Sequence, residues 1–332
     1  MGRESGRCYL LGLVHTPMSA NHEQRFSALA SRWLGGEPNR MATPFTPLAS
    51  PSWRGVDAEL LKVERGERAV MIKAWFPDTH FYIDTEHASR VARVAAEQQL
   101  APAVYEYVAE YPALVMEALG AEWRVARLED IYAPATREAV FTTFKALEHL
   151  TATAPWASAA VDQQLDELLP WAAADSDFSA AHLARWGDFV SRATAIIKAT
   201  GVDQVLVHGD ANLSNLLLHD DGEVRLVDFD MAGLADPFQQ LGCCLMEYCD
   251  SEAVAREGFE QWRGYFNEHE FQRAMVYAML DDLRWGLIAQ RLSNHSPRRH
   301  QEFGKYASWR LWRFEAWLER HSDARLRTLG AS

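Results

Sequence analysis

Three polar residues in the segment 205–230, VLVHGDANLSNLLLHDDGEVRLVDFD, have the types that phosphoryl transfer requires. Asp210 precedes Asn215, and Asp228 follows both after the segment LLLHDDGEVRLV. Transfer of a phosphoryl group from a nucleotide needs a carboxylate that orients or deprotonates the attacking hydroxyl, and further oxygen ligands that hold Mg²⁺ on the phosphates. Asp210, Asn215 and Asp228 could therefore supply this carboxylate and these oxygen ligands.

The elements around these residues are a short hairpin and a set of long helices. Asp221-Gly222 is a strong signal for a tight turn, because such turns need the positive φ that glycine adopts readily. Elsewhere in the second half, apolar residues recur at helical spacing. Helices are predicted over 136–150, 157–172, 178–200, 236–249, 252–267, 269–293 and 299–321. The three polar residues are therefore expected on loops beside a small hairpin, inside a helical region.

The first third of the chain is predicted to be rich in strands. Helices are predicted over 21–34 and 85–100, and pairs of strands over 56–76 and 105–119. The second helix is expected to end before Pro102, since proline disfavours the helical conformation in the residue before it. A boundary near residues 117–121 separates this part from the helical part.

Length and charge limit the classes of function. A chain of 332 residues favours about two domains. Its net charge of −13 argues against a nucleic-acid partner, which needs a surface rich in Lys and Arg, and fits a cationic ligand.

The cysteines and the N-terminus favour a cytoplasmic protein. The cysteines lack the CxxC spacing of metal sites and are predicted to be reduced and buried. They are Cys8, Cys243, Cys244 and Cys249. The apolar run CYLLGLV near the N-terminus is too short to cross a membrane, so no membrane association is expected.

Two motifs in the opening segment carry a family resemblance. The octapeptide HGDANLSN, residues 208–215, together with VDFD, residues 227–230, resembles the catalytic core of the aminoglycoside phosphotransferase and choline kinase superfamily, which shares the protein kinase fold. The resemblance implies an α+β, two-lobed structure. It consists of a small β-rich nucleotide-binding lobe, residues 1–117, and a large helical catalytic and substrate lobe, residues 118–332. It also implies ATP or GTP as the phosphate donor, with Mg²⁺. From the order of the motif residues it further implies that Asp210 orients the acceptor hydroxyl and takes its proton, and that Asn215 and Asp228 hold Mg²⁺.

The same resemblance assigns residues to the nucleotide side of the site. Lys73, in the stretch VMIKAW, is similar to the strand lysine that contacts the nucleotide phosphates. Glu86 would be the helix glutamate that pairs with this lysine. The segment LVMEALG resembles the linker that holds the adenine edge, which implies contacts from Met116, Glu117 and Ala118.

Two departures from the family pattern concern the nucleotide loop and the catalytic segment. The segment PLASPSWRGVDAE offers only Gly55 and two serines where the family has a loop rich in glycine, serine and asparagine. Gln240 stands where an acidic residue is common.

Two further residues of the motifs have less specific interpretations. His208 is interpreted as a brace for the catalytic loop. Asp230 either adds negative charge near the substrate or metal or is a solvated turn residue.

On the substrate side, the resemblance to choline kinases implies an amine pocket that contains Glu247, Trp285 and Tyr306. Aromatic faces and carboxylates together bind amines. The tryptophans at 309, 312 and 317 recur at near-helical spacing, which is more typical of a core.

The implied reaction is transfer of a γ-phosphate to a hydroxyl of an amine-bearing substrate such as choline or a related amino alcohol. Phosphorylation of an aminoglycoside or another antibiotic is the second hypothesis. A catalytically inactive nucleotide-binding protein is the third.

Overall fold

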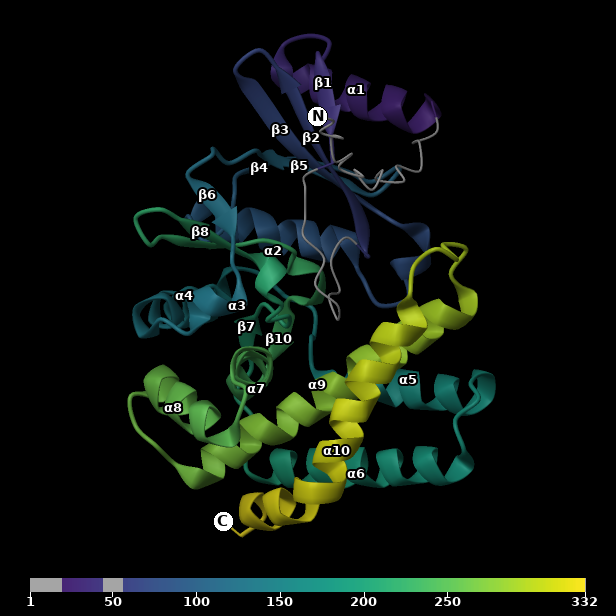
Figure 1. Cartoon of the computed structure of the whole chain (residues 1–332), viewed down its shortest axis with the longest axis vertical. Coiled ribbons are helices and arrows are strands. Elements are labelled where there is room, and N and C mark those ends of the chain that lie inside the picture. Colours follow the sequence, from purple (N-terminus) through teal and green to yellow (C-terminus); the bar gives the residue numbers. More distant parts are fainter. Residues whose placement is uncertain (1–19, 44–55, 332) are drawn as a thin grey trace, which may run out of the picture.

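The computed structural model describes residues 20–43 and 56–331, which form a strand-rich part above a larger helical part (Figure 1). The predicted division into β-rich and helical regions is confirmed. Between residues 56 and 117 the chain builds most of a sheet, and beyond residue 126 helices dominate.

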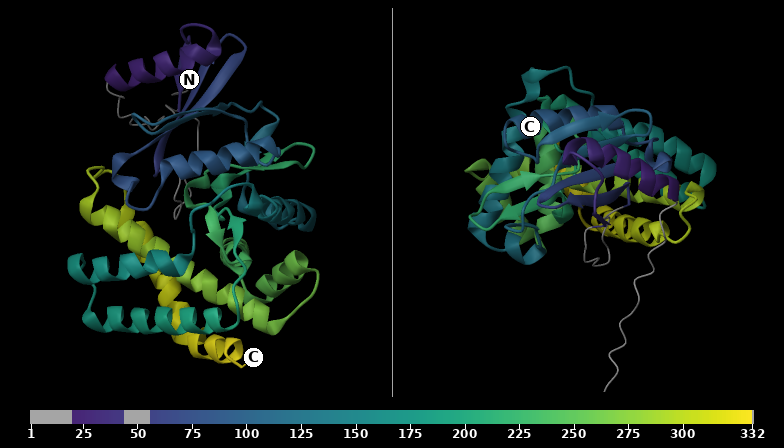
Figure 2. Two further views of the ribbon diagram at one scale, coloured as in Figure 1. Left: turned by 180° about the vertical axis from the view of Figure 1, so that it is seen from behind. Right: turned by 90° about the horizontal axis from the view of Figure 1, so that it is seen from above.

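The strand-rich part is one antiparallel sheet with a helix on each face. Its strands are β1 (Arg40–Ala42), β2 (Ala58–Arg65), β3 (Arg68–Trp75), β4 (Val104–Val108) and β5 (Ala113–Glu117). They lie in the order β1-β2-β3-β5-β4. The helices are α1 (Ala20–Leu34) and α2 (Thr85–Glu97), which Figure 2 shows from behind and from above.

Alternation along β3 decides which way Lys73 points. Successive strand residues face opposite sides of a sheet. Val70 and Ile72 belong to the hydrophobic cluster of α1, whereas Trp75 packs in the cluster that contains α2. Lys73, two residues before Trp75, therefore projects on the α2 side, toward the helical part.

The helical part surrounds a long central helix. Its helices are α3 (Leu128–Ile131), α4 (Pro134–Glu148), α5 (Val161–Asp175), α6 (Ala180–Ala199), α7 (Pro237–Tyr248), α8 (Glu252–Arg263), α9 (Glu268–His295) and α10 (Phe303–Leu329). Most of α9 is buried, and α10 packs along it. The seven long helices predicted from periodicity are confirmed, although α5 and α10 both begin and end later than predicted.

Short strands lie within the segment 205–230 or pair with it. They are β6 (Trp123–Val125), β7 (Val205–Val207), β8 (Leu216–His219), β9 (Val224–Leu226) and β10 (Gly233–Ala235). Strands β8 and β9 form the predicted hairpin, and Gly222 in its turn has the expected positive φ of 98°. Among the described residues, no helix has the length and apolar character needed to cross a membrane.

The described cysteines follow the prediction in part. Cys243 and Cys244 are buried and Cys249 is half-buried, and all three are free thiols. Cys8 and Gly55 lie outside the described residues. Of the tryptophans on α10, Trp312 is 69% exposed, so it belongs to the surface and not to the core.

Candidate active site

The loop after β7 brings Asp210 and Asn215 into direct contact. The Asn215 side-chain amide donates to Asp210 Oδ2 at 2.8 Å, and the backbone N–H of Asn212 donates to Asp210 Oδ1 at 2.9 Å. Gly209 has a φ of 77°, and a Cβ on it would lie 2.2 Å from the carbonyl oxygen of Met231. The loop therefore needs glycine at this position to hold Asp210 in place.

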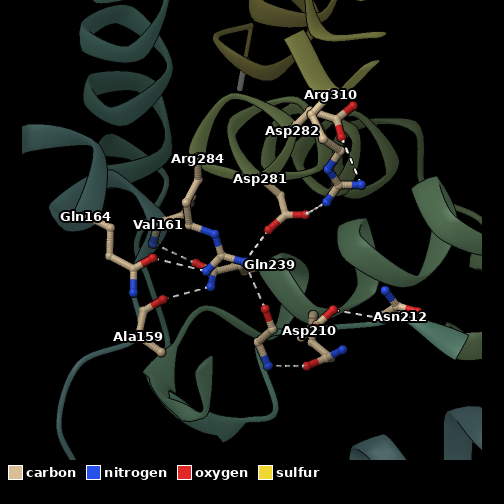
Figure 3. A network of polar contacts seen from close by, with 12 residues as sticks. Ala159, Val161, Gln164, Asp210, Asn212, Gln239, Asp281, Asp282, Arg284 and Arg310 are labelled. Atoms are coloured by element: carbon tan, nitrogen blue, oxygen red, sulfur yellow. Dashed lines mark hydrogen bonds and ion pairs between the residues drawn. The ribbon is translucent and has the colours of Figure 1, made fainter. Parts of the chain in front are cut away.

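Three side chains hold this loop in place through hydrogen bonds. Gln240 Oε1 accepts from the backbone N–H of Gly209 at 2.8 Å, and Arg284 donates to the Gly209 carbonyl at 2.9 Å. Figure 3 shows Arg284 between Gln164, Asp281 and this loop. His208 donates from Nε2 to the Val227 carbonyl at 3.0 Å, which agrees with its interpretation as a brace.

Burial sets the charge states of two loop residues. It lowers the pKa of His208 to about 4, so the imidazole is neutral at pH 7. It raises the pKa of Asp210 to about 7, against the stabilising N–H of Asn212, and the charge of Asp228 adds to the rise. A carboxylate with a pKa near neutrality is suited to accept a proton from a hydroxyl.

Lys73 lies between two carboxylates. Its ammonium is 2.8 Å from Asp228 Oδ1 and 2.6 Å from Asp230 Oδ1. The Trp75 indole also donates to Asp230, at 2.9 and 3.0 Å. Burial acts to lower the pKa of Lys73, but the two carboxylates outweigh it and raise that pKa. Asp228 itself has a φ of 70°, a left-handed conformation that is uncommon outside glycine and frequent at functional sites.

The predicted ion pair between Lys73 and Glu86 is wrong. The Glu86 side chain is exposed in the first turn of α2, and the described ion pairs of Lys73 are with Asp228 and Asp230. The buried neighbours of Glu86 are Thr85 and His87, so the helix turns Glu86 outward. Asp230, which the sequence left open as a solvated turn residue, is the buried partner instead, with a side chain 5% exposed.

Sequence reasoning missed Asp57. This residue is 8% exposed, and its carboxylate accepts from the Tyr82 hydroxyl. The ligand oxygens of Asp57, Asp228 and Asp230 all lie within 4.8 Å of one another. Burial and the charge of Asp228 raise the pKa of Asp57 to about 6. No spacing signal marks Asp57, because it precedes β2 and is far from the catalytic loop in the sequence.

A cavity of about 290 Å³ joins the sheet to the catalytic loop. Its lining includes Lys73 together with Asn215 and Asp228. The three residues predicted at the adenine edge, Met116, Glu117 and Ala118, line it as well. The structure thus brings together the residues predicted on the nucleotide side, apart from Glu86.

The donor set in this cavity suits Mg²⁺. Asn215 and Asp228 offer amide and carboxylate oxygens on the same wall, and magnesium prefers oxygen ligands of this kind. The Asp228 side chain is 31% exposed, so its carboxylate is accessible from the cavity as well as paired with Lys73. These residues therefore fit a magnesium ion.

The residues predicted on the substrate side do not form an open amine cage. The Glu247 carboxylate, on α7, binds the guanidinium groups of Arg310 and Arg313. Burial acts to raise the pKa of Glu247, but these two charges hold it at about 2. Glu247 is therefore already neutralised by two partners on α10.

The two aromatic residues of the predicted cage have different surroundings. Trp285 is only 3% exposed and contacts the ring of Tyr82 edge-on, with 6.3 Å between centroids. It is a core residue at the junction of the two lobes. Tyr306 is half-buried, with the guanidinium of Arg310 5.7 Å from its ring centroid.

Comparisons with known proteins agree with this architecture. A structure of a choline/ethanolamine kinase family protein from Mesorhizobium loti is 19% identical, with a TM-score of 0.76 over 94% of this chain and 99% of that one. A choline kinase from Streptococcus pneumoniae is 13% identical, with a TM-score of 0.71 over 91% of this chain and 100% of that one. These likenesses confirm the predicted kinase-like fold.

A thermostable mutant of an aminoglycoside phosphotransferase, solved as a ternary complex with ADP and hygromycin B, is also similar. It is 14% identical, with a TM-score of 0.56 over 91% of this chain and 98% of that one. No curated protein sequence matches the chain.

The sequence itself also matches a family model. The model describes the phosphotransferase enzyme family, and it matches residues 53–275, more than half of the chain. This range includes Lys73 and the catalytic segment 205–230. The chain therefore belongs to the phosphotransferase enzyme family.

Proposed function

We propose that this protein is a small-molecule kinase that transfers the γ-phosphate of ATP or GTP to a hydroxyl of an amine-bearing substrate, with an amino alcohol such as choline as the leading candidate. The observation that carries the proposal is the meeting of two polar pairs, Asp210 with Asn215 and Lys73 with Asp228, beside one cavity. These groups are the ones that phosphoryl transfer requires.

In the proposed mechanism each residue has a separate task. Asp210 orients the acceptor hydroxyl and takes its proton, for which its raised pKa is suited. Lys73 is placed to neutralise charge on the phosphates. Asn215 and Asp228 would hold Mg²⁺, which when bound neutralises the negative charge of the phosphate oxygens.

The lobes and the location belong to the same proposal. Residues 1–117 form the nucleotide-binding lobe and residues 118–332 the catalytic and substrate lobe. The cavity supports this division, because its walls come from β3, β5 and the catalytic segment. Three free cysteines support a cytoplasmic location, where thiols stay reduced.

Two observations bear on the acceptor. The similar choline and ethanolamine kinase structures have TM-scores of 0.76 and 0.71, above the 0.56 of the aminoglycoside phosphotransferase complex. This difference favours an amino alcohol over an antibiotic. Because Glu247 is already paired with Arg310 and Arg313, it is a weaker partner for a substrate amine than the sequence suggested. The negative charge that attracts a cationic substrate would then come from Asp210 and the aspartates near it.

The aminoglycoside remains the second candidate, because an enzyme of this fold holds ADP and hygromycin B together. A catalytically inactive nucleotide-binding protein is the third. The contacts of Asp210 with Asn215 and of Lys73 with Asp228 favour an active enzyme, because an inactive protein does not depend on this geometry.

A panel assay separates these candidates. Nucleotide consumption is measured with Mg²⁺ and ATP or GTP against choline, ethanolamine, other amino alcohols, sugars and aminoglycosides. Asp210→Asn is the blank, and Asp220→Asn, an exposed change in the nearby hairpin, is the matched control. Turnover with an amino alcohol, lost only in Asp210→Asn, is the expected result. Turnover with aminoglycosides alone would overturn the proposed acceptor, and nucleotide binding without any turnover would favour the inactive protein.

A further inference from the structure

The turn between α9 and α10 reaches across to the strand-rich lobe (Figures 1 and 2). Arg298 in this turn donates from Nε and Nη2 to Asp78 Oδ2, at 3.0 and 2.9 Å, and from Nη1 to the carbonyl of Val56. Ser296 Oγ donates to the same Asp78 oxygen at 2.6 Å. Two residues of the helical lobe thus hold two residues of the strand-rich lobe.

This contact is largely buried and geometrically specific. The side chains of Arg298 and Asp78 are 11% and 16% exposed. The guanidinium also lies 4.2 Å from the ring centroid of Phe76 and 5.1 Å from that of Phe303. A charge-assisted pair with several donors on one acceptor is stronger than a surface ion pair, and removal of one partner leaves the other charge buried and unpaired.

Arg298 is linked to the active site through one peptide unit. Val56, whose carbonyl it holds, is followed by Asp57, and the Asp57 carbonyl accepts from the Phe76 N–H at 3.0 Å. The Asp57 carboxylate faces Asp228 and Asp230 in the cluster described above. A shift of the Val56 backbone would therefore move the Asp57 carboxylate relative to Asp228 and Asp230.

We propose that Arg298 is a positioning residue for phosphoryl transfer, which rests on the proposed kinase function. Its contacts with Val56 and Asp78 join the helices of the substrate side to the sheet of the nucleotide side. By holding Val56, Arg298 also positions the neighbouring Asp57 next to Asp228. Arg298 touches no reacting group in this account. Its role is to keep the two lobes in register at the site.

The first test compares Arg298→Met with Arg298→Lys. Arg298→Met should lower kcat by about 10- to 100-fold, since a displacement of about 1 Å at a reacting centre costs up to roughly that much. Arg298→Lys keeps the charge but not the forked geometry, so it should recover part of the loss. Asp78→Asn weakens the same pair from the other lobe and should lower kcat in the same direction.

Two arginines serve as matched controls. Arg325, also on the α9–α10 side and 3% exposed, pairs with Glu252 within the helical lobe. Arg325→Met should lower the thermal midpoint but leave kcat unchanged. Arg299, the exposed neighbour of Arg298, should tolerate methionine without loss of either quantity. Wild-type kcat in folded Arg298→Met, or a loss no larger than that in Arg325→Met, would overturn the proposal.

A second readout does not depend on turnover. Amide hydrogen exchange of residues 56–58 and 76–82 should accelerate in Arg298→Met and in Asp78→Asn, but not in Arg325→Met. Unchanged exchange in these segments would refute the proposed contact even if no acceptor is found. Faster exchange without turnover by the wild-type protein would instead uphold the link between the lobes and reject the kinase function.

Discussion

Lys73 and Asp230 lie 2.6 Å apart, and this ion pair stands where a lysine–glutamate pair with Glu86 was expected. Asp228 holds the other side of the same ammonium at 2.8 Å. Lys73, which lines the cavity, is therefore oriented by the segment that also supplies the proposed metal ligand. A change in that segment should therefore affect both the orientation of Lys73 and the proposed metal ligand.

Replacement of Asp230 should impair turnover far more than replacement of Glu86. Asp230→Asn removes a charge-assisted hydrogen bond worth roughly 1.5–3 kcal/mol, so kcat/KM should fall by about 10- to 100-fold. Glu86→Gln, on the exposed side of α2, should leave kcat/KM within about twofold. Steady-state kinetics of both variants decide the matter. A larger loss in Glu86→Gln than in Asp230→Asn would restore the pairing that the sequence suggested.

Replacement of Gly209 by alanine should disrupt the catalytic loop. The added Cβ would meet the Met231 carbonyl oxygen at 2.2 Å, and the φ of 77° adds strain. Gly66→Ala is the matched control, because Gly66 has a φ of 61° and nothing lies within 4 Å of its Cβ position. The control should cost about 1 kcal/mol in free energy of unfolding from strain alone, and Gly209→Ala clearly more. Equal losses in urea unfolding would show that the loop accommodates the side chain.

The Glu247 cluster should make stability depend on pH. The folded-state pKa of Glu247, about 2, lies below its ordinary value of 4.5. Its contribution is therefore fully present above pH 4.5 and is lost as the pH falls toward 2. Glu247→Gln should lower the free energy of unfolding by roughly 3 kcal/mol at pH 7. The gap between wild type and variant should narrow below pH 4.5.

Urea unfolding at pH 7, 4 and 3 measures this gap. The exposed Glu129, whose side chain is 71% accessible, provides the control, and Glu129→Gln should show a small difference at every pH. A gap for Glu247→Gln that stays constant from pH 7 to pH 3 would contradict the assigned ion pairs with α10.

The parts of the site that the sequence could predict are those close together in the chain. Asp210, Asn215 and Asp228 lie within one segment whose hairpin has a recognisable turn, so their order and spacing were informative. Clear alternation predicted the strand that carries Lys73, but Lys73 itself was found because the stretch VMIKAW resembles the lysine-bearing strand of the family. The fold class followed from the change of periodicity near residue 120 and from the family resemblance.

The parts that it could not predict depend on tertiary packing. The rotation of α2 about its axis decides that Glu86 faces solvent, and no local pattern specifies it. Asp57 reaches Asp228 only after the sheet folds over the catalytic loop. Glu247 is neutralised because α10 brings Arg310 and Arg313 to its carboxylate, a tertiary contact that the sequence alone does not reveal. The contact of Arg298 with Val56 joins residues that are 242 positions apart.

The proposed role of Asp210 is to accept the proton of the attacking hydroxyl, and a single pair of proteins decides whether it does so. Turnover and equilibrium nucleotide binding are measured for wild type and Asp210→Asn with the best acceptor of the panel. We expect kcat to fall by about 10²- to 10⁴-fold, the usual contribution of a general base, while the nucleotide Kd changes little. Full turnover in the folded Asp210→Asn variant would contradict the account and remove Asp210 from its role.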